Sequence, residues 1–431
     1  MSRQTYLDVT PLLERFRSGF SSRPIPIRKI GREAEYPVVN ADGTAFDIAQ
    51  LWADLAGPGL TRERMSGGMI VGLNGMKYSY ASEVGRGTIE VITGPRHDLV
   101  SLARDHEEAV RRLVTVAAKH GARILGVGVQ PVTPASVDLM TPKPRYGVLH
   151  DVIGDPWLSF TSTASDQTHV DVSSPEIAAM ANLCNMLSPV IIALCANSGV
   201  VAGGDAGVVS WREKAMGEIQ PEHGRHGMPV EPAETLAHHM EMLANLPHLM
   251  HRIDGVATAG TGRPFRELMG DMDKEEVWKS FLVHEHYVWH SARPRSRQGT
   301  VEIRCACQQP WDSHMAASAL ALGLVSGAAE IAQFLGDQLG PDGWEKMRQW
   351  HTEVIVHGLQ APEPAEGFIL GVLERARSAL RARGRKEAPF IEPLFQRLKR
   401  RESPAHRMRA IFAESGMAAV IEEASIPAQV E

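Results

Sequence analysis

Residues 31–36 read Gly-Arg-Glu-Ala-Glu-Tyr and place two carboxylates at alternate positions of an apolar-flanked segment. Successive side chains of a β-strand point to opposite faces of the sheet, so Glu33 and Glu35 would share one face. Burying two negative charges together is costly unless a cation compensates them. The segment therefore predicts a cation site on a sheet, and the alternative is the exposed edge of a half-buried strand.

Two further segments carry groups that bind metals. In residues 80–90, Glu83 precedes a glycine-flanked turn and Glu90 follows on the next predicted strand. In residues 167–171, Gln-Thr-His-Val-Asp, His169 lies on a predicted strand. Each segment alone is more often structural than functional.

The segment 299–304, Gly-Thr-Val-Glu-Ile-Arg, places Glu302 and Arg304 on one strand face. Taken with the other segments, it completes an oxygen-rich set with a single imidazole, which suits Mg²⁺ or Mn²⁺ better than Zn²⁺. Such ions would neutralise the carboxylates and hold nucleotide phosphates, to which Arg304 would donate a charge-assisted hydrogen-bond fork. No GxxxxGK[ST] loop occurs in the sequence, so the nucleotide is not expected to bind as in P-loop proteins.

Apolar periodicity around these segments predicts an α+β protein with a largely antiparallel sheet, followed by a helical subdomain. The expected strands are residues 36–39, 68–73, 87–91, 123–129, 169–173, 284–290 and 299–306. The expected helices are residues 7–16, 99–120, 175–197, 232–250, 311–335, 344–356, 367–383 and 404–422. We expect an N-terminal helix and linker (1–29), a catalytic domain (30–310) and a helical C-terminal subdomain packed on it (311–431).

Composition limits the class of protein. The 431 residues are 43% hydrophobic and 22% charged, which is close to the globular average. A net charge of -6 gives no electrostatic reason to expect nucleic acid as a partner. We also expect no membrane association, because the N-terminus lacks a signal-peptide pattern and the apolar run 187–202 is short and interrupted. Four cysteines favour a reducing cytoplasm and free thiols.

Eight stretches in this order resemble the glutamate–cysteine ligase family, in its plant-type and bacterial carboxylate–amine ligase branches. They are GREAEYPVV, YASEVGRGTIEVITGP, LGVGVQPVTP, MTPKPRY, DQTHVDVS, LCANSG, VSWRE and WHSARPRSRQGTVEIR, spread over residues 30 to 310. The resemblance implies a curved antiparallel β-sheet that forms a funnel of glutamine-synthetase-like type, flanked by helices.

The resemblance also implies roles for individual residues. One Mg²⁺ would be held by Glu33, His169 and Glu302. One or two more would be held by Glu35, Glu83 and Glu90. Arg304 would contact the transferred phosphate, Arg212 a substrate carboxylate or phosphate, and Arg145 with Lys143 would close the site or bind an acidic group.

The implied reaction is an ATP-dependent ligation through an acyl phosphate, with glutamate and cysteine as the default acid and amine. A homodimer is compatible with this reading. One alternative is a ligase of the same family that joins another amino acid or amine in specialised metabolism. Others are a phosphagen-kinase-like phosphotransferase and a non-catalytic binding protein. The run Cys305-Ala306-Cys307 stands where many relatives carry an acidic residue, which leaves the substrate pair more open than the reaction type.

Overall fold

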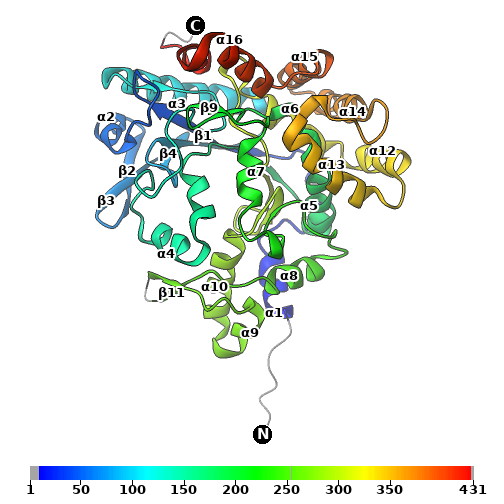
Figure 1. Ribbon diagram of the computed structural model, residues 1–431. Helices are drawn as coiled ribbons and strands as arrows, with labels where there is room; N and C mark the ends of the chain where they lie inside the picture. The colour runs from blue at the N-terminus through cyan, green and yellow to red at the C-terminus, as the bar shows by residue number, and fades with distance from the viewer. Residues whose placement is uncertain (1–8, 254, 429–431) are drawn as a thin grey trace.

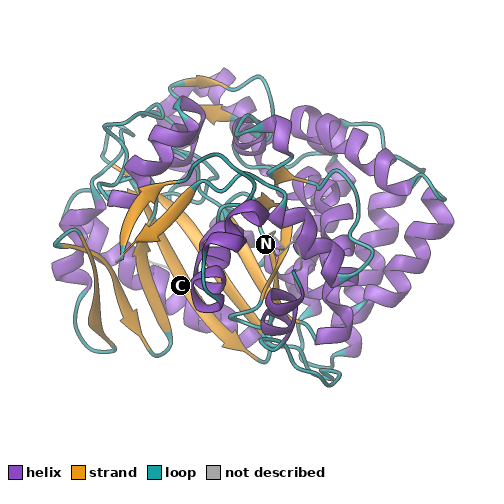
Figure 2. Ribbon diagram, turned by 90° about the horizontal axis from the view of Figure 1, so that it is seen from below, coloured by secondary structure: helices purple, strands orange, loops and turns teal. Residues whose placement is uncertain are grey.

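A single antiparallel sheet organises the molecule, as expected from the sequence. The computed structural model describes residues 9–253 and 255–428. The sheet has nine strands, and its neighbours pair in antiparallel register throughout (Figure 2). Its order is β14 (Ala292–Arg295), β15 (Thr300–Ile303), β7 (Asp166–Asp171), β1 (Ile30–Val39), β5 (Thr88–Arg96), β4 (Tyr78–Ser82), β3 (Met69–Gly75) and β2 (Leu60–Ser66), with β6 (Arg123–Ile124) pairing the end of β1.

Three short two-stranded sheets lie outside it. They are β8 (Val200–Val201) with β9 (Gly204–Asp205), β10 (His226–Gly227) with β13 (Trp289–His290), and β11 (Met250–Ile253) with β12 (Val256–Ala259). The β10–β13 pair is parallel, and the other two pairs are antiparallel.

Helices surround the sheet (Figure 1). They are α1 (Thr10–Arg17), α2 (Trp52–Leu55), α3 (Leu99–Lys119), α4 (Pro144–Ile153), α5 (Ile177–Met186), α6 (Ser188–Cys195), α7 (Trp211–Gly217), α8 (Leu236–Ala244), α9 (Phe265–Leu268), α10 (Lys274–His286), α11 (Ala316–Ser326), α12 (Ala328–Leu339), α13 (Gly343–His357), α14 (Phe368–Ala382), α15 (Glu392–Arg400) and α16 (Pro404–Ala424). The helix α3 agrees closely with its prediction: Asp98 caps its start by accepting a hydrogen bond from the Ser101 N–H, and Gly121 follows its end.

The register of the sheet sets the functional side chains side by side. Across β15 and β7, Glu302 pairs with His169, and across β7 and β1, Glu33 pairs with Gln167. On the other side of β1, Glu35 pairs with Glu90 of β5. Polar groups from four neighbouring strands therefore gather at the centre of one face of the sheet.

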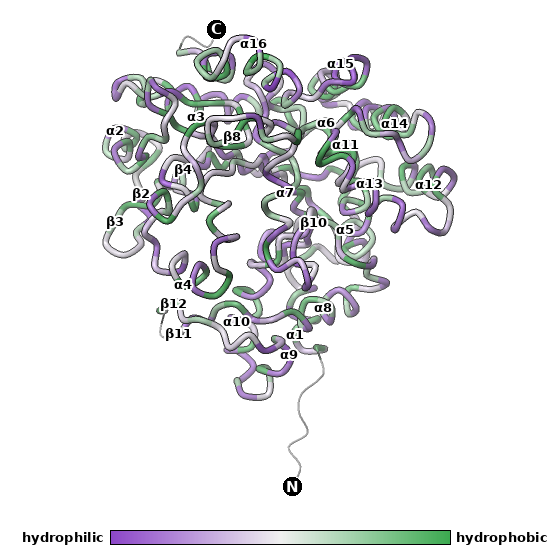
Figure 3. The backbone as a smooth tube through the Cα atoms, viewed as in Figure 1, coloured by the Kyte–Doolittle hydropathy of each residue, from purple (hydrophilic) through white to green (hydrophobic). Residues whose placement is uncertain are grey.

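The opposite face is packed against helices. Val170 and Val301 belong to the largest hydrophobic cluster, together with residues of α5, α6, α11 and α14. Figure 3 shows α11 as a predominantly hydrophobic segment, consistent with its burial. On this face Arg32 forms a bidentate pair with Asp166 at 2.8 and 2.9 Å, with neither side chain exposed. Removing either partner would leave a buried charge, at a cost of roughly 3–5 kcal/mol.

Some sequence-based predictions were wrong in extent or type. The helix expected over residues 175–197 is broken at Leu187, and α5 and α6 meet at 43° because Pro189 starts a new helix there. The strand expected over residues 284–290 is helical at its start, over residues 284–286. An Asp273–Glu276 capping box starts α10, which continues to His286, and only residues 289–290 form a strand.

Other boundaries moved as well. The strand expected over residues 123–129 is confined to β6, and the helix expected over 232–250 is the shorter α8, after which residue 250 begins β11. The helix expected over 311–335 bends by 85° between α11 and α12. The first two residues of the predicted N-terminal helix lie outside the described residues.

The C-terminal helices share their core with the sheet. The largest hydrophobic cluster extends from Val9 to Leu394 and includes residues on both sides of position 310. The division into segments at 29/30 and 310/311 therefore stays a prediction. Among the described residues, no single helix is long and apolar enough to cross a membrane, and the bent pairs α5–α6 and α11–α12 reach that length only when their halves are combined.

Candidate active site

A cavity of about 780 Å³ opens on the polar face of the sheet. Helix α7, near the centre of Figure 1, and helix α4, to its lower left, both contribute to its lining. The structure brings every side chain that the sequence analysis singled out for a role to this cavity: Glu33, Glu35, Glu83, Glu90, Lys143, Arg145, His169, Arg212, Glu302 and Arg304. Their individual roles stay predictions, and their common location is a property of the fold.

The first group of candidate metal ligands is Glu33, His169 and Glu302, whose donor atoms lie within 4.8 Å of one another. His169 Nε2 lies 3.3 Å from Glu33 Oε1, and His169 Nδ1 lies 3.0 Å from Thr300 Oγ1. The threonine thereby orients the ring, as an outer partner does for a metal-bound imidazole. Burial would raise the pKa of Glu33, but the His169 ring beside it holds that pKa below its usual range.

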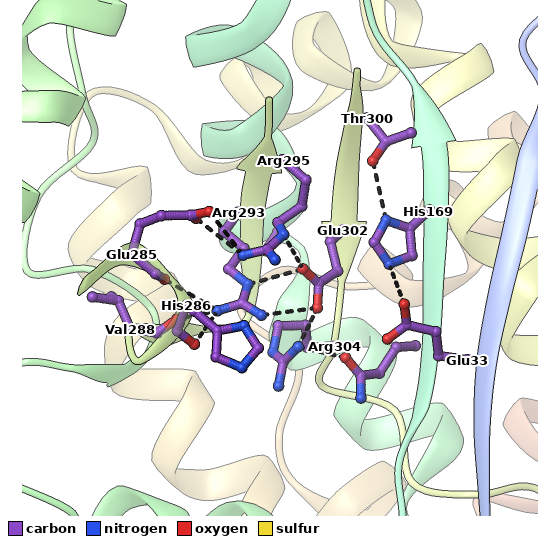
Figure 4. A network of polar contacts seen from close by, with 12 residues as sticks. Glu33, His169, Glu285, His286, Val288, Arg293, Arg295, Thr300, Glu302 and Arg304 are labelled. Atoms are coloured by element: carbon purple, nitrogen blue, oxygen red, sulfur yellow. Dashed lines mark hydrogen bonds and ion pairs between the residues drawn. The ribbon is translucent and has the colours of Figure 1, made fainter. Parts of the chain in front are cut away.

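Glu302 is saturated by arginines (Figure 4). Arg293 donates to both carboxylate oxygens at 2.9 and 3.2 Å, the Arg295 Nε lies 3.3 Å from Oε2, and Arg304 Nη1 donates to Oε1. Burial would raise the pKa of Glu302, but Arg293, Arg304 and Arg295 together hold it well below its usual range. Four guanidinium contacts occupy the lone-pair positions of one carboxylate. Glu302 can therefore bind a metal only if one of these arginines moves away from it.

The second group is Glu35, Glu83 and Glu90, again with donor atoms within 4.8 Å of one another. Burial and then the Glu83 charge raise the pKa of Glu35 to about 7. Burial, followed by the charges of Glu33 and Glu83, raises the pKa of Glu90 well above its usual range. Buried carboxylates this close repel unless a cation neutralises them, so the donor set fits a hard, oxygen-seeking ion such as Mg²⁺ or Mn²⁺.

Two basic residues at the start of α4 flank Glu83. Lys143 Nζ donates to the Ser82 carbonyl at 2.6 Å and lies 3.3 Å from the Tyr146 hydroxyl. Burial lowers the pKa of Lys143 to about 8. The Arg145 guanidinium stacks over the Tyr146 ring and donates to its hydroxyl at 3.1 Å. Both cations are placed to meet an anionic ligand beside Glu83.

Arg212 lies near the start of α7 and is almost completely buried. Its Nη1 donates to Glu213, whose second carboxylate oxygen lies 3.6 Å from His226 Nε2. Among the described residues the buried Nε of Arg212 has no hydrogen-bond partner. This guanidinium therefore keeps a donor for an acidic ligand, because buried donors in native proteins are normally paired.

Sequence reasoning missed part of the lining. Arg293 and Arg295 alternate on β14 as do Glu302 on β15 and Arg304 just after its end, so the same period of two would have placed them on one face. An aromatic wall was also missed: Trp157 and Phe160 lie 4.7 Å apart between ring centroids, and Phe160 and Trp289 5.2 Å. Trp157 and Phe160 share one short helical segment, but Trp289 comes from β13, and no local pattern brings it to them.

The fold and site thus define an α+β protein with one cavity on its antiparallel sheet, lined by clustered carboxylates and arginines, which are groups that can bind divalent cations and phosphates. The particular family follows from comparison. Residues 63–423 match the model of "Glutamate-cysteine ligase family 2 (GCS2)", and the chain belongs to this family.

Individual relatives carry the same name. Chloroplastic glutamate–cysteine ligase of Medicago truncatula is 24% identical over 368 residues, which cover 81% of this chain and 70% of that protein. Glutamate–cysteine ligase of Haloquadratum walsbyi is 30% identical over 207 residues, which cover 48% of this chain and 47% of that protein. The matched region thus spans about half the length of the Haloquadratum protein and 59% of the length of a putative glutamate–cysteine ligase of Rubrobacter xylanophilus.

A solved structure confirms the fold. Glutamate–cysteine ligase of Francisella tularensis, in complex with AMP, superposes with a TM-score of 0.55 at 10% identity, covering 94% of this chain and 89% of that one. This likeness extends over nearly the whole length of both chains.

Proposed function

We propose that this protein is an ATP-dependent ligase that forms an amide from a carboxylate and an amine, with glutamate and cysteine as the default pair. The observation that carries the proposal is the joint placement of two metal-capable groups, Arg304 and Arg212 in one cavity. Membership of the family and the AMP held by the Francisella enzyme support nucleotide binding there.

Two bond exchanges make up the reaction. An oxygen of the acid's carboxylate attacks the γ-phosphorus of ATP, the bond to the bridging β,γ-oxygen breaks, and ADP leaves. The amine nitrogen then attacks the acyl carbon, loses a proton, and expels phosphate together with the carboxylate oxygen. Activation must come first, because a free carboxylate has a poor leaving group.

The protein contributes placement and charge rather than covalent chemistry. Arg304 has donors beyond the Nη1 that contacts Glu302 and Gln167, and these would hold the transferred phosphate. Arg212 would hold the acid's second carboxylate, and Lys143 with Arg145 would hold a further anionic group beside Glu83.

Mg²⁺ or Mn²⁺, held by Glu35, Glu83 and Glu90 and by Glu33 with His169, would neutralise the phosphate oxygens. Glu302 would join Glu33 and His169 where Arg304 turns toward phosphate. A homodimer and a cytoplasmic location stay predictions, and the four cysteines are free and buried.

ADP release from ATP tests the proposal. Purified protein with Mg²⁺ should release ADP only when glutamate is present, faster when cysteine is added, and an equimolar amide should appear by mass spectrometry. Chelation by EDTA should stop both signals. ADP release without an amide for any amine in a panel of amino acids would contradict ligation and favour a phosphotransferase.

A further inference from the structure

Arg293 is the most completely engaged side chain at the cavity. It lies on β14 directly opposite Glu302 on β15 and is 5% exposed. Its Nε donates to Glu302 Oε2 at 2.9 Å and its Nη2 to Oε1 at 3.2 Å, which makes a two-pronged pair. Its Nη1 donates to the carbonyls of His286 and Val288, both at 2.8 Å.

Those carbonyls belong to the end of α10 and the turn that follows it. The last carbonyls of a helix have no partner within the helix, and a cation there satisfies them and the negative end of the helix dipole. A third, longer contact reaches the Glu285 carbonyl at 3.3 Å. Arg293 is therefore one rigid group that joins a helix terminus to a cavity carboxylate (Figure 4).

The orientation of Glu302 in turn governs Arg304. Arg304 Nη1 donates to Glu302 Oε1 and to Gln167 Oε1, so the positions of these two oxygens fix the position of its guanidinium. The two hydrogen bonds from Arg293 fix the plane of the Glu302 carboxylate. In this orientation Glu302 faces Arg304 on one side and His169, its partner across the strands, on the other.

We infer that Arg293 is a positioning residue that ties the end of α10 to Glu302 and thereby sets Glu302 and Arg304 for phosphate and metal. The inference rests on the proposed function and goes beyond it, because it assigns a role to a residue whose donors all bind Glu302 or backbone carbonyls. Lysine cannot replace it, since an ammonium is a single point charge without the planar fork.

Arg225 supplies a matched control. It is also completely buried, and it donates to the Tyr287 carbonyl at 2.9 Å, in the same turn after α10. Its other partners are the Pro247 carbonyl and Gln220, and none of its hydrogen bonds reaches Glu302. Replacing Arg225 by lysine therefore disturbs the same turn without touching the carboxylate.

The test compares Arg293→Lys with Arg225→Lys in the full chain. Both variants should lower the melting temperature to a similar degree. Only Arg293→Lys should lower kcat, by roughly 100-fold, with KM for glutamate within about threefold of wild type. Displacing Glu302 and Arg304 from their reactive positions lowers the rate of the chemical step more than it weakens substrate binding. Only Arg293→Lys should raise the Mg²⁺ concentration needed for half-maximal stabilisation by ADP, by roughly 10-fold.

Two outcomes would overturn the inference: equal kcat in the two variants, or an unchanged Mg²⁺ requirement in Arg293→Lys. If Arg293→Lys does not fold, Arg293→Gln, which keeps a donor for the carbonyls but loses the fork, takes its place. If wild-type protein releases no ADP, the proposed function fails, and the Mg²⁺·ADP melting shift still decides the role of Arg293.

Discussion

Replacing Glu90 by glutamine should stabilise the metal-free protein. The carboxylate oxygens of Glu90, Glu35 and Glu83 lie within 4.8 Å of one another, and in the part of the chain that the structure describes the Glu90 side chain has no hydrogen bond to lose. At that separation two unit charges repel by about 3 kcal/mol at an effective dielectric constant of about 20. Since neighbouring carboxyls are partly protonated near neutral pH, we expect a net gain of roughly 1–3 kcal/mol at pH 8.

The gain should depend on pH in a defined direction. A carboxyl whose folded pKa is raised adds stability that is complete below its unfolded pKa of 4.5 and is lost as pH rises through the folded pKa, about 7 for Glu35. Wild-type protein in EDTA should therefore lose stability between about pH 4.5 and 8. Glu90→Gln removes one such group, so its advantage should be large at pH 8 and small at pH 5.

Urea unfolding in EDTA at pH 5 and pH 8 measures this directly. Glu241→Gln, an exposed substitution on α8, controls for the loss of a surface charge. Mg²⁺ should stabilise wild type more than Glu90→Gln, because the variant lacks one ligand. The reasoning would be refuted if Glu90→Gln were no more stable than wild type at pH 8, or if its gain were equal at both pH values.

Other predictions concern the remaining groups of the cavity. Glu302→Gln should abolish measurable ATP turnover with a native circular dichroism spectrum, and lower the unfolding free energy by about 3 kcal/mol because buried arginines lose a shared partner; substantial retained turnover would exclude Glu302 from the reaction. Arg304→Lys should cut kcat by roughly 100-fold despite keeping the charge, because the fork is lost; an unchanged rate would remove it from the phosphate site. The Lys143 ammonium loses its proton as pH rises through about 8, so KM for the substrate whose anionic group it holds should rise above that pH. Lys143→Arg should flatten this rise, and the same rise in both proteins would place its cause elsewhere.

The candidate site was predictable where its information is local. Alternation along a strand is a property of a few consecutive residues, so the shared faces of Glu33 with Glu35 and of Glu302 with Arg304 follow from the sequence. The grouping of the ligands into two sets depends on the register between strands, such as the pairing of Glu302 with His169. The sequence pattern does not show how the strands are aligned with one another. The assignment of the ligands to two sets came from the resemblance to a family.

Features that depend on distant contacts were not predictable. The saturation of Glu302 needs Arg293 and Arg295, whose strand was not expected as a separate element. The hydrogen bonds of Arg293 to the end of α10 depend on a helix that was expected to be a strand over residues 284–290. Polar residues fill positions 284–286 of that segment, and helix initiation upstream at Asp273 carries α10 through them to His286.

Oxygen-18 transfer tests the central claim of acyl-phosphate ligation most directly. Glutamate labelled with ¹⁸O in its side-chain carboxylate is incubated with ATP, Mg²⁺ and cysteine, and the released phosphate is analysed by mass spectrometry. The account predicts one ¹⁸O atom per phosphate, because the attacking carboxylate oxygen leaves with the phosphoryl group. Unlabelled phosphate, or the label in AMP, would contradict it.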